Sequence, residues 1–585
     1  MASAAGPCFS DDLGDTAPVT TEDVFREFLL SSPMKDAPDN VRENAVKLFS
    51  LRLGDHSTSL SSPCDTLAAA SEQDSARRWL SWARDGENPL HQLIRSNEHE
   101  IPDGILPAEC RDARLTDFRV QPPKPGKGGQ GDRRRRGPLT DDAVYAEHKE
   151  LRDKLARGNC FLEYSTASAE LAPGQATAAA DSLDRHQICT VYGLRKFTGG
   201  LGDDDNDLVD QPDEEAAAPA GDAAESGGGG AEPSQEQAPR WANFFSSSLA
   251  EVQSVVATSK ANGEAAHFAA RYLHGRWVLI AGSKNVHVVF SRRRDLGLYK
   301  QGQYTVAERV AHAVCDALDK LDSRQCLMFL SFLACTGYTA IFELLQPEYQ
   351  HVESLSHLLR PQLQFICWSS FMDSFNDVCV GALDPMLCHH MAKAFGLEPV
   401  ACEDLPLDEL DVYLTKVRND HGHEGNVLYF LNEKRCPVGL LKRKTVWYIC
   451  IRAIREKTKT ALRVLDRREK QKKPAAKGEK APSQLPSEGH YMRGVYDKIT
   501  RRFQDIDSWL EFGKDCHRQW LDLALGFVHY VIDHVADGSL PREEVNNRFP
   551  DVWNRYLQVS GSTDRIYADI PPCKAAESVF VHKNK

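Results

Sequence analysis

The stretch that most restricts how this chain can fold is residues 201–239, which read LGDDDNDLVDQPDEEAAAPAGDAAESGGGGAEPSQEQAP. It holds twelve carboxylates and no Lys or Arg. Such a segment buries too little apolar surface to offset the entropy lost on ordering, so we expect it to be disordered. We interpret it as an insertion within one domain, which requires the residues on its two sides to belong to the same fold.

Two other stretches have the composition of flexible linkers, because they are rich in Pro, Gly and basic residues. The first includes QPPKPGKGGQGDRRRRGP at 121–138. Its four arginines are either solvated charge, a nuclear localisation signal or a nucleic-acid contact. From these stretches we predict a helical N-terminal region at 1–120, a basic flexible linker at 121–140, a main domain at 141–465, a second basic linker at 466–489 and a helical C-terminal domain at 490–585.

The spacing of apolar residues predicts helices in the two outer regions. Near the N-terminus, Thr21 is a candidate helix cap before Val24, Phe25, Phe28 and Leu29, which would share one helix face. Near the C-terminus, large apolar residues recur every three or four positions, as in a long amphipathic helix. They are Trp509, Phe512, Cys516, Trp520, Leu523, Phe527 and Val531.

The overall charge of −13 does not exclude a nucleic-acid partner, because twelve acidic residues lie in the 201–239 stretch and the remainder is near neutral. The sixteen cysteines include no C-x-x-C pair, which argues against a zinc ribbon and against a compact disulfide framework. The N-terminus lacks a signal-peptide pattern, and the best apolar run, 326–335, is too short to span a bilayer. We therefore expect an intracellular protein, cytoplasmic or nuclear, with no membrane partner and reduced thiols.

Between the linkers, the pattern favours short strands with interspersed helices. Residues 265–290 predict two strands around the turn 274–276, and 339–347 predict a buried strand that Pro347 ends. Residues 425–449 predict a second hairpin, whereas 305–334 are typical of helix. We therefore expect an α+β domain built on antiparallel sheet.

Several ionisable residues fall at the ends of these predicted strands. Lys260, in KANG, follows a β-branched run, and Glu343 and Glu424 begin or interrupt apolar strands. An unpaired carboxylate there would be costly unless it bound a ribose hydroxyl, a metal or a cation. Lys442 and Lys444, in GLLKRKTVWY, are two apart on a strand and would point to one face, where both could reach a polyphosphate.

The ordered series K-x-x-G, S-K, F-E, E-G and K-x-K resembles the nucleotidyltransferase motifs of ATP-dependent RNA ligases, of the phage RNA ligase 1 type and the adenylyltransferase domain of fungal tRNA ligases. VYGLRKFTGG at 191–200 and RWANFFSSS at 240–248 resemble the segments that precede the first motif. The second lacks the family's lysine before the paired phenylalanines. The resemblance covers about 185–465 and implies an antiparallel-sheet nucleotidyltransferase core, ATP-grasp-like in type, flanked by helical regions.

This resemblance implies that Lys260 attacks the α-phosphate of ATP and becomes linked to AMP. Lys442 and Lys444 would ease loss of the Lys260 proton by like-charge repulsion and neutralise phosphate charge. Gly263 would let the backbone approach the nucleotide closely. Glu343 would hold the ribose. Glu424 would help place a divalent metal, either Mg²⁺ or Mn²⁺.

Four further residues are candidates for phosphate contacts: Lys284, Arg195, Lys196 and, as a loose substitute for the missing lysine, Arg240. The implied activity joins an RNA 3′-hydroxyl to a 5′-phosphate through an RNA-adenylate, in RNA repair or tRNA splicing. The chain has no G-x-x-x-x-G-K-[ST] motif and no paired H-x-[ST] motifs, so separate enzymes would have to heal the RNA ends.

The segment 434–480 holds seventeen Lys or Arg against four acidic residues, which favours either a solvated basic helix or a contact with an RNA backbone. The C-terminal helical domain is a further candidate for RNA binding. Two alternatives to an RNA ligase stay open: another nucleotidyltransferase, such as a capping enzyme or a DNA ligase, and an RNA-binding scaffold with a ligase-like fold and no activity.

Overall fold

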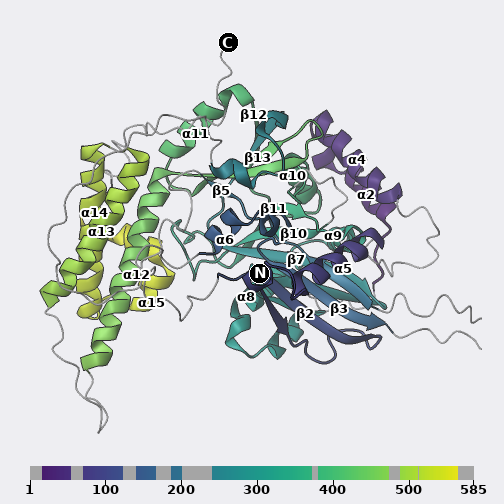
Figure 1. Cartoon of the computed structure of the whole chain (residues 1–585), viewed down its shortest axis with the longest axis horizontal. Helices are drawn as coiled ribbons and strands as arrows, with labels where there is room; N and C mark the ends of the chain where they lie inside the picture. Colours follow the sequence, from purple (N-terminus) through teal and green to yellow (C-terminus); the bar gives the residue numbers. More distant parts are fainter. Residues whose placement is uncertain are drawn as a thin grey trace, which may run out of the picture.

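The computed structural model describes residues 16–54, 70–122, 140–166, 186–199, 240–371, 380–472, 488–511 and 513–563. These residues form an α+β structure with three sheets (Figure 1). The acidic stretch 201–239 lies outside the described residues. So do 123–139 of the first expected linker and 473–487 of the second.

The first of two five-stranded sheets, the β7 sheet, has the order β11-β10-β7-β8-β9 and is antiparallel throughout. The turn between β7 and β8 has positive φ at His274 and Gly275, at 45° and 81°, which is typical of a two-residue hairpin turn. This hairpin and strand β10 agree with the sequence predictions. The strands are β7 (Glu264–Leu273), β8 (Arg276–Gly282), β9 (His287–Phe290), β10 (Thr339–Leu345) and β11 (Gln362–Ser369).

The second five-stranded sheet, the β13 sheet, has the order β12-β6-β13-β14-β5. The predicted hairpin at 425–449 forms β13 and β14, although the chain becomes helical after residue 445. The strands are β5 (Thr198–Gly199), β6 (Ser254–Ser259), β12 (Cys402–Leu405), β13 (Gly425–Leu431) and β14 (Pro437–Lys444).

Residues on both sides of the acidic stretch lie against the same strand, β14. On one side, β5 pairs with it in parallel, Thr198 opposite Leu441. On the other side, the 3₁₀ helix η3 (Arg240–Phe244) leads to Ser246, whose backbone N–H donates to the carbonyl of Val438 at 2.8 Å. Trp241 and Phe245 share a buried apolar cluster with Val438 and Leu441. The described residues before and after the acidic stretch therefore lie against one strand of the same sheet.

The region 1–120 is only partly helical, which corrects the prediction from sequence. Residues 94–120 contain β1 and β2, and β2 pairs with β3 beyond the first expected linker. Local periodicity did not reveal β2, because Leu115 to Phe118 are buried on both faces of the strand. This N-terminal sheet, with the order β1-β2-β3-β4, comprises β1 (Ile94–His99), β2 (Cys110–Val120), β3 (Asn159–Thr166) and β4 (His186–Val191).

Helices cover the sheets. Helices α8 and α9 pack on the β7 sheet, and they agree with the helical prediction for 305–334. The helices of this part of the chain are α2 (Thr21–Leu30), α3 (Ser32–Lys35), α4 (Asp39–Gly54), α5 (Ala70–Arg84), α6 (Asp141–Glu147), α7 (Lys149–Lys154), α8 (Thr305–Leu318), α9 (Ser323–Thr336), α10 (Pro385–Ala394) and α11 (Leu410–Asn419). The short 3₁₀ helices are η1 (His91–Leu93), η4 (Leu249–Glu251), η5 (Arg293–Leu298), η6 (Gly302–Tyr304) and η7 (Leu407–Glu409).

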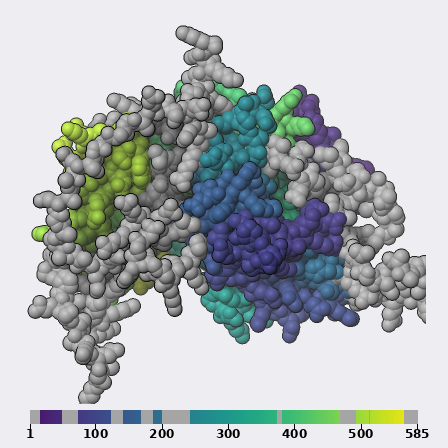
Figure 2. Space-filling view, viewed as in Figure 1, coloured from purple at the N-terminus to yellow at the C-terminus, as the bar shows by residue number. Residues whose placement is uncertain are grey.

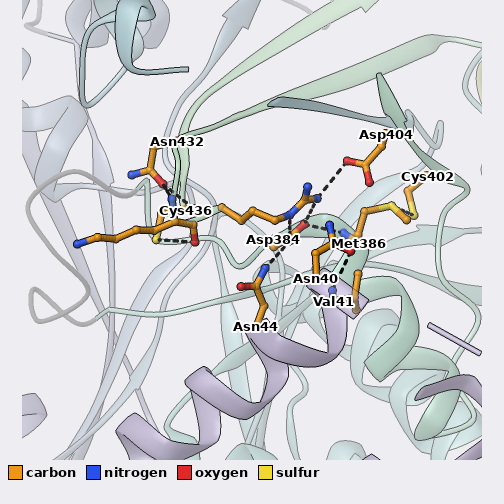
Figure 3. Close-up of polar contacts among 11 residues, drawn as sticks. Asn40, Val41, Asn44, Asp384, Met386, Cys402, Asp404, Asn432 and Cys436 are labelled. Atoms are coloured by element: carbon orange, nitrogen blue, oxygen red, sulfur yellow. Dashed lines mark hydrogen bonds and ion pairs between the residues drawn. The ribbon is translucent and has the colours of Figure 1, made fainter. Parts of the chain in front are cut away.

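Helix α4 contacts a largely buried ion pair of the sheet body, drawn in Figure 3. Asp384, which caps α10, accepts from Arg435 Nε at 2.5 Å and from Asn44 of α4 at 3.4 Å. Arg435 also donates to Asp404 at 3.1 Å. One carboxylate therefore joins α4, α10 and the turn between β13 and β14.

The C-terminal helices form a second body beside the sheets (Figures 1 and 2). They are α12 (Val446–Lys472), α13 (Glu488–Leu510), α14 (Lys514–Ala536), α15 (Arg542–Asn547) and α16 (Phe549–Val559). Residues of α12 share one apolar core with α13, α14 and α16. The predicted boundary at 465 therefore falls inside a helix, and 466–472 are helical rather than linker. Among the described helices, none is both long and apolar enough to cross a membrane.

Candidate functional site

Lys260 lies where the chain passes from the β13 sheet to the β7 sheet. Strand β6 ends at Ser259 and β7 begins at Glu264, so the tetrad KANG forms the connection. The Lys260 backbone N–H donates to the Gly425 carbonyl at 2.9 Å, which holds this lysine beside the start of β13. Its side chain is 23% exposed, so the amine is partly enclosed and still reachable from solvent.

Glu424 is the residue around which this site is organised. Its Oε1 lies 3.1 Å from Lys260 Nζ and 3.9 Å from Lys444 Nζ, and its side chain is 5% exposed. Burial would raise the pKa of Glu424, but the two ammonium groups and a hydrogen bond from Asn262 hold this pKa below its ordinary value. Glu424 is therefore an anion shared by two lysines.

Asn262 is a site residue that the sequence analysis did not identify. Its amide nitrogen donates to Glu424 Oε2 at 2.8 Å and to the Tyr448 hydroxyl at 3.1 Å. Its amide oxygen accepts from the backbone N–H groups of Val352 and Glu353 at 3.0 and 3.1 Å. One buried amide thus connects the KANG connection, β13, α12 and the loop after β10. Its position in KANG was the only signal in the sequence.

Gly263 and Glu343 fix the other end of the connection. The Gly263 N–H donates to Glu343 Oε1 at 2.9 Å. A Cβ on Gly263 would lie 2.3 Å from the Leu344 carbonyl oxygen, so no larger residue fits without moving β10. Burial raises the pKa of Glu343 to about 7, opposed by Lys260 and by the Gly263 hydrogen bond. The predicted contact of Glu343 with a ribose stays a prediction.

A third carboxylate, Glu353, belongs to the site and was missed by the sequence analysis. Its Oε1 accepts from the Glu424 backbone N–H at 2.5 Å. Burial raises the pKa of Glu353 to about 7. The loop that carries it also reaches the C-terminal helices, because the Gln350 N–H donates to the Asn547 carbonyl at 2.6 Å and the Ser356 hydroxyl to Asp551 at 2.6 Å.

Lys442 and Lys444 share one face of β14, as their spacing predicts. Lys444 is opposite Gly425 in the strand register, and its Nζ lies 5.4 Å from the ring centre of Tyr448. Lys442 is farther along the strand, opposite Val427, and is buried. The structure therefore brings Lys444 to Glu424, whereas Lys442 lies toward Lys196.

Arg195 and Lys196 lie beside a different pocket, lined also by Arg152, Phe244 and Leu440 but not by Lys260. Lys196 Nζ lies 2.7 Å from Asp142 Oδ1. Burial and the positive charge of Lys442 lower the pKa of Lys196 to about 8. Arg195 donates to the Tyr192 hydroxyl at 3.2 Å. Lys442 is the link between this pocket and the Lys260 site, since its charge affects Lys196 and it shares a face of β14 with Lys444.

The last two candidates for phosphate contacts are Lys284 and Arg240. Lys284 is exposed in the turn after β8. Since β8 ends opposite His267, that turn lies at the same end of the β7 sheet as Gly263. Arg240 begins η3, and its side chain lies outside what the structure describes.

A line of cations continues from the site along α12. Tyr448, which accepts from Asn262, is followed on this helix by Arg452, Arg455, Lys459 and Arg463, spaced by three or four residues and so on one face. Burial and the charge of Arg455 lower the pKa of Lys459 to about 8. Arg455 also pairs with Glu456 at 2.8 Å. We call these four residues the α12 cation row.

Residues 240–455 match a family described as a domain of unknown function (DUF7920). The matched segment begins at η3 and ends within α12, so it contains Lys260, Glu343, Glu424 and Lys444. It leaves out the N-terminal sheet and α13 to α16. No curated protein matches the chain.

Proposed function

We propose that this protein is an ATP-dependent RNA ligase that joins a 3′-hydroxyl to a 5′-phosphate. The observation that carries the proposal is the placement of the Lys260 amine at 3.1 Å from the anionic Glu424, with Lys444 on the same carboxylate. A nucleophilic lysine must lose its proton, which the like charge of Lys444 favours, and it needs cations that neutralise phosphate charge. The Glu424 anion opposes loss of the proton but holds both amines at one position.

In the first step, Lys260 Nζ forms a bond to the α-phosphorus of ATP, and the bond to the β-phosphate oxygen breaks to release pyrophosphate. The ammonium must give up a proton before this attack. Glu343 and Glu353 are candidate acceptors, because each has a pKa near 7 and each is influenced by the charge of Lys260. Lys444 and Lys442 would then stabilise the charge that develops on the phosphates.

Two further transfers complete the reaction. An oxygen of the RNA 5′-phosphate displaces Lys260 from the α-phosphorus, and the RNA 3′-hydroxyl then displaces AMP from the 5′-phosphate. Both steps depend mainly on positioning and charge neutralisation. The α12 cation row begins one helical turn from Tyr448 and offers a path for the RNA backbone toward Lys260.

The proposed metal role of Glu424 requires a change in its partners. Its two oxygens now face Lys260, Lys444 and Asn262, and among the described residues no three-donor cluster includes it. When Lys260 becomes neutral and bonds to AMP, its ion pair with Glu424 is lost. Glu424 would then be free to bind a divalent cation that enters with the nucleotide, as Mg²⁺ commonly does.

The test is incubation of the purified chain with α-labelled ATP and Mg²⁺, followed by denaturing electrophoresis. We expect one acid-labile label on the protein, which Lys260→Ala abolishes, whereas Lys300→Ala, an exposed lysine outside the site, keeps it. Lys260→Ala should still seal pre-adenylylated RNA, because that step starts after the lysine has acted.

Other results would separate the alternatives. A label from GTP in place of ATP would indicate a capping enzyme, and sealing of nicked DNA in preference to RNA would indicate a DNA ligase. RNA binding with no label under any nucleotide would favour a scaffold. A label that survives Lys260→Ala would overturn the assignment of the nucleophile.

A further inference from the structure

A buried cluster of metal-binding residue types lies away from Lys260, between the N-terminal sheet and the β7 sheet. It contains Asp117 on β2, Cys160 on β3 and His287 on β9, all at most 3% exposed. One donor atom from each lies within 4.8 Å of the other two. None of these residues has a role in the proposed ligase chemistry.

The ring of His287 is oriented as in a metal-binding histidine, with one nitrogen toward the cluster and the other toward a neighbouring side chain. Its Nδ1 lies 2.5 Å from Asp117 Oδ1, on the side of the cluster. Its other ring nitrogen, Nε2, lies 3.2 Å from His267 Nδ1. Histidines that bind metals usually direct the free ring nitrogen to such a partner, which fixes the ring orientation.

His99 provides an independent observation. Its side chain is 2% exposed, and its Nε2 lies 2.9 Å from Asp117 Oδ2, so the ring faces the same carboxylate as His287. Its Nδ1 has no hydrogen-bond partner among the described residues. A buried ring nitrogen without a partner is costly, and a reorientation of this ring toward a bound ion would remove that cost.

We propose that Asp117, Cys160 and His287, with His99 as the fourth ligand, bind a structural Zn²⁺. One sulfur, two imidazoles and one carboxylate match the ligands of zinc, whereas Mg²⁺ and Ca²⁺ take oxygen ligands. Four protein ligands would close the coordination sphere, as structural zinc sites require.

Zinc binding requires a rearrangement and the release of protons. Two nitrogen or oxygen ligands of tetrahedral zinc lie about 3.4 Å apart, so Asp117 and His287 must separate by roughly 1 Å. His99 lies outside the group of three whose donor atoms are all within 4.8 Å of one another, so its ring must also move toward Cys160 and His287. The Cys160 thiol and the Nδ1 position of His287 each give up a proton, which passes to solvent. The bound ion would join β1, β2 and β3 to β9 and so fasten the N-terminal sheet to the β7 sheet.

The experiment measures zinc in the full chain after removal of any affinity tag, by mass spectrometry of the metal. We expect about one zinc per chain, near-complete loss in Cys160→Ser and Asp117→Asn, and weaker retention against a chelator in His99→Gln. Cys367→Ser is the matched control, because Cys367 is equally buried on β11. Replacement of zinc by Co²⁺ should give a thiolate-to-cobalt absorption band that Cys160→Ser removes.

The wild-type chain decides the question even if Cys160→Ser does not fold. Folded wild-type protein that contains no zinc and takes up neither Zn²⁺ nor Co²⁺ would overturn the proposal. A cobalt complex without the thiolate band would exclude Cys160 as a ligand. The adenylylation assay is independent, so failure of the zinc proposal leaves the ligase proposal unaffected.

Discussion

At the scale of single residues, the site near Lys260 depends on a small number of buried polar contacts with several partners each. Asn262 contacts Glu424, Tyr448 and two backbone N–H groups through one side-chain amide. Glu343 and Glu353 each accept a backbone N–H and have raised pKa values. Substitutions at these positions should therefore affect stability and reactivity together, and paired variants are needed to separate the two.

Asn262→Ala should lower the free energy of unfolding by about 2 to 4 kcal/mol, because the N–H groups of Val352 and Glu353 lose their acceptor and Glu424 loses a donor. Urea unfolding would measure this change. Asn262→Asp keeps the acceptor but places a second carboxylate against Glu424, so it should lose the AMP adduct even where the fold persists. Asn285→Ala, in the exposed turn after β8, is the control. Equal stability of Asn262→Ala and wild type would contradict the prediction.

The raised pKa of Glu343 gives a stability that depends on pH. A carboxyl group whose pKa rises on folding from 4.5 to about 7 stabilises the fold when protonated. This contribution is fully present below about pH 4.5 and is lost as the pH rises through about 7. We expect the free energy of unfolding to fall by about 1 to 3 kcal/mol over this interval.

Glu343→Gln should remove part of this pH dependence, and Glu343→Gln combined with Glu353→Gln should remove most of it. Thermal unfolding between about pH 5 and pH 8 would measure the effect. Glu433→Gln, at an exposed position in the turn between β13 and β14, should leave the profile unchanged. Parallel profiles for the double variant and wild type would show that the raised pKa values are not responsible.

At the scale of elements, α12 connects the reactive lysine with the C-terminal helices. Its apolar face belongs to the C-terminal core, and the face that provides Tyr448 to the site continues into the α12 cation row. Arg452, Arg455 and Lys459 also lower the pKa of His351 to about 4, after burial as the largest cause. Since His351 lies in the loop that carries Glu353, the row and the Lys260 site share one electrostatic environment.

Arg452→Gln combined with Lys459→Gln should weaken RNA binding and leave adduct formation unchanged, because neither residue is assigned a role in the transfer of AMP to Lys260. For single-stranded RNA, the slope of log affinity against log salt should become shallower by about 1.4. Filter binding at several salt concentrations would measure the slope. Arg493→Gln combined with Arg501→Gln removes two exposed arginines from α13 and provides a charge-matched control. The same loss in both double variants would mean that α12 has no special role.

At the scale of the whole molecule, two bodies meet at the site: the sheets and the C-terminal helices. The loop after β10 contacts both, through Glu353 at Glu424 and through Gln350 at Asn547. The acidic stretch 201–239 enters and leaves the sheet body at β14, the strand that carries Lys442 and Lys444. The stretch between these two attachment points holds twelve carboxylates.

Replacement of 201–239 by a short Gly/Ser linker should leave the thermal unfolding temperature and adduct formation almost unchanged, because loop closure depends only logarithmically on length. RNA binding should strengthen at low salt, with the gain fading as ionic strength rises. Substitution of the twelve carboxylates by their amides, at full length, separates charge from length. A chain that no longer folds would contradict the interpretation of this stretch as an insertion.

The sequence by itself determined the features that depend on neighbouring residues. The β7–β8 turn follows from His274 and Gly275, the β13–β14 hairpin from two apolar runs on either side of a polar turn, and the common face of Lys442 and Lys444 from the strand period. The order of the ionisable residues also suggested that Lys260, Glu343, Glu424 and Lys444 belong to one site, and the structure places these four around one connection.

Only the tertiary structure decided the features that depend on contacts between distant segments. β2 is a strand because it pairs with β3 across a linker, and α12 continues past residue 465 because the C-terminal helices bury its apolar face. The partners of the Asn262 side chain are 90 to 186 residues away in the sequence, and the partner of the Glu353 side chain is 71 residues away. The ligands of the proposed zinc site come from four strands, so no short cysteine spacing could have indicated them. Local pattern carries information about local backbone geometry, whereas the partners of buried polar groups are set by chain packing.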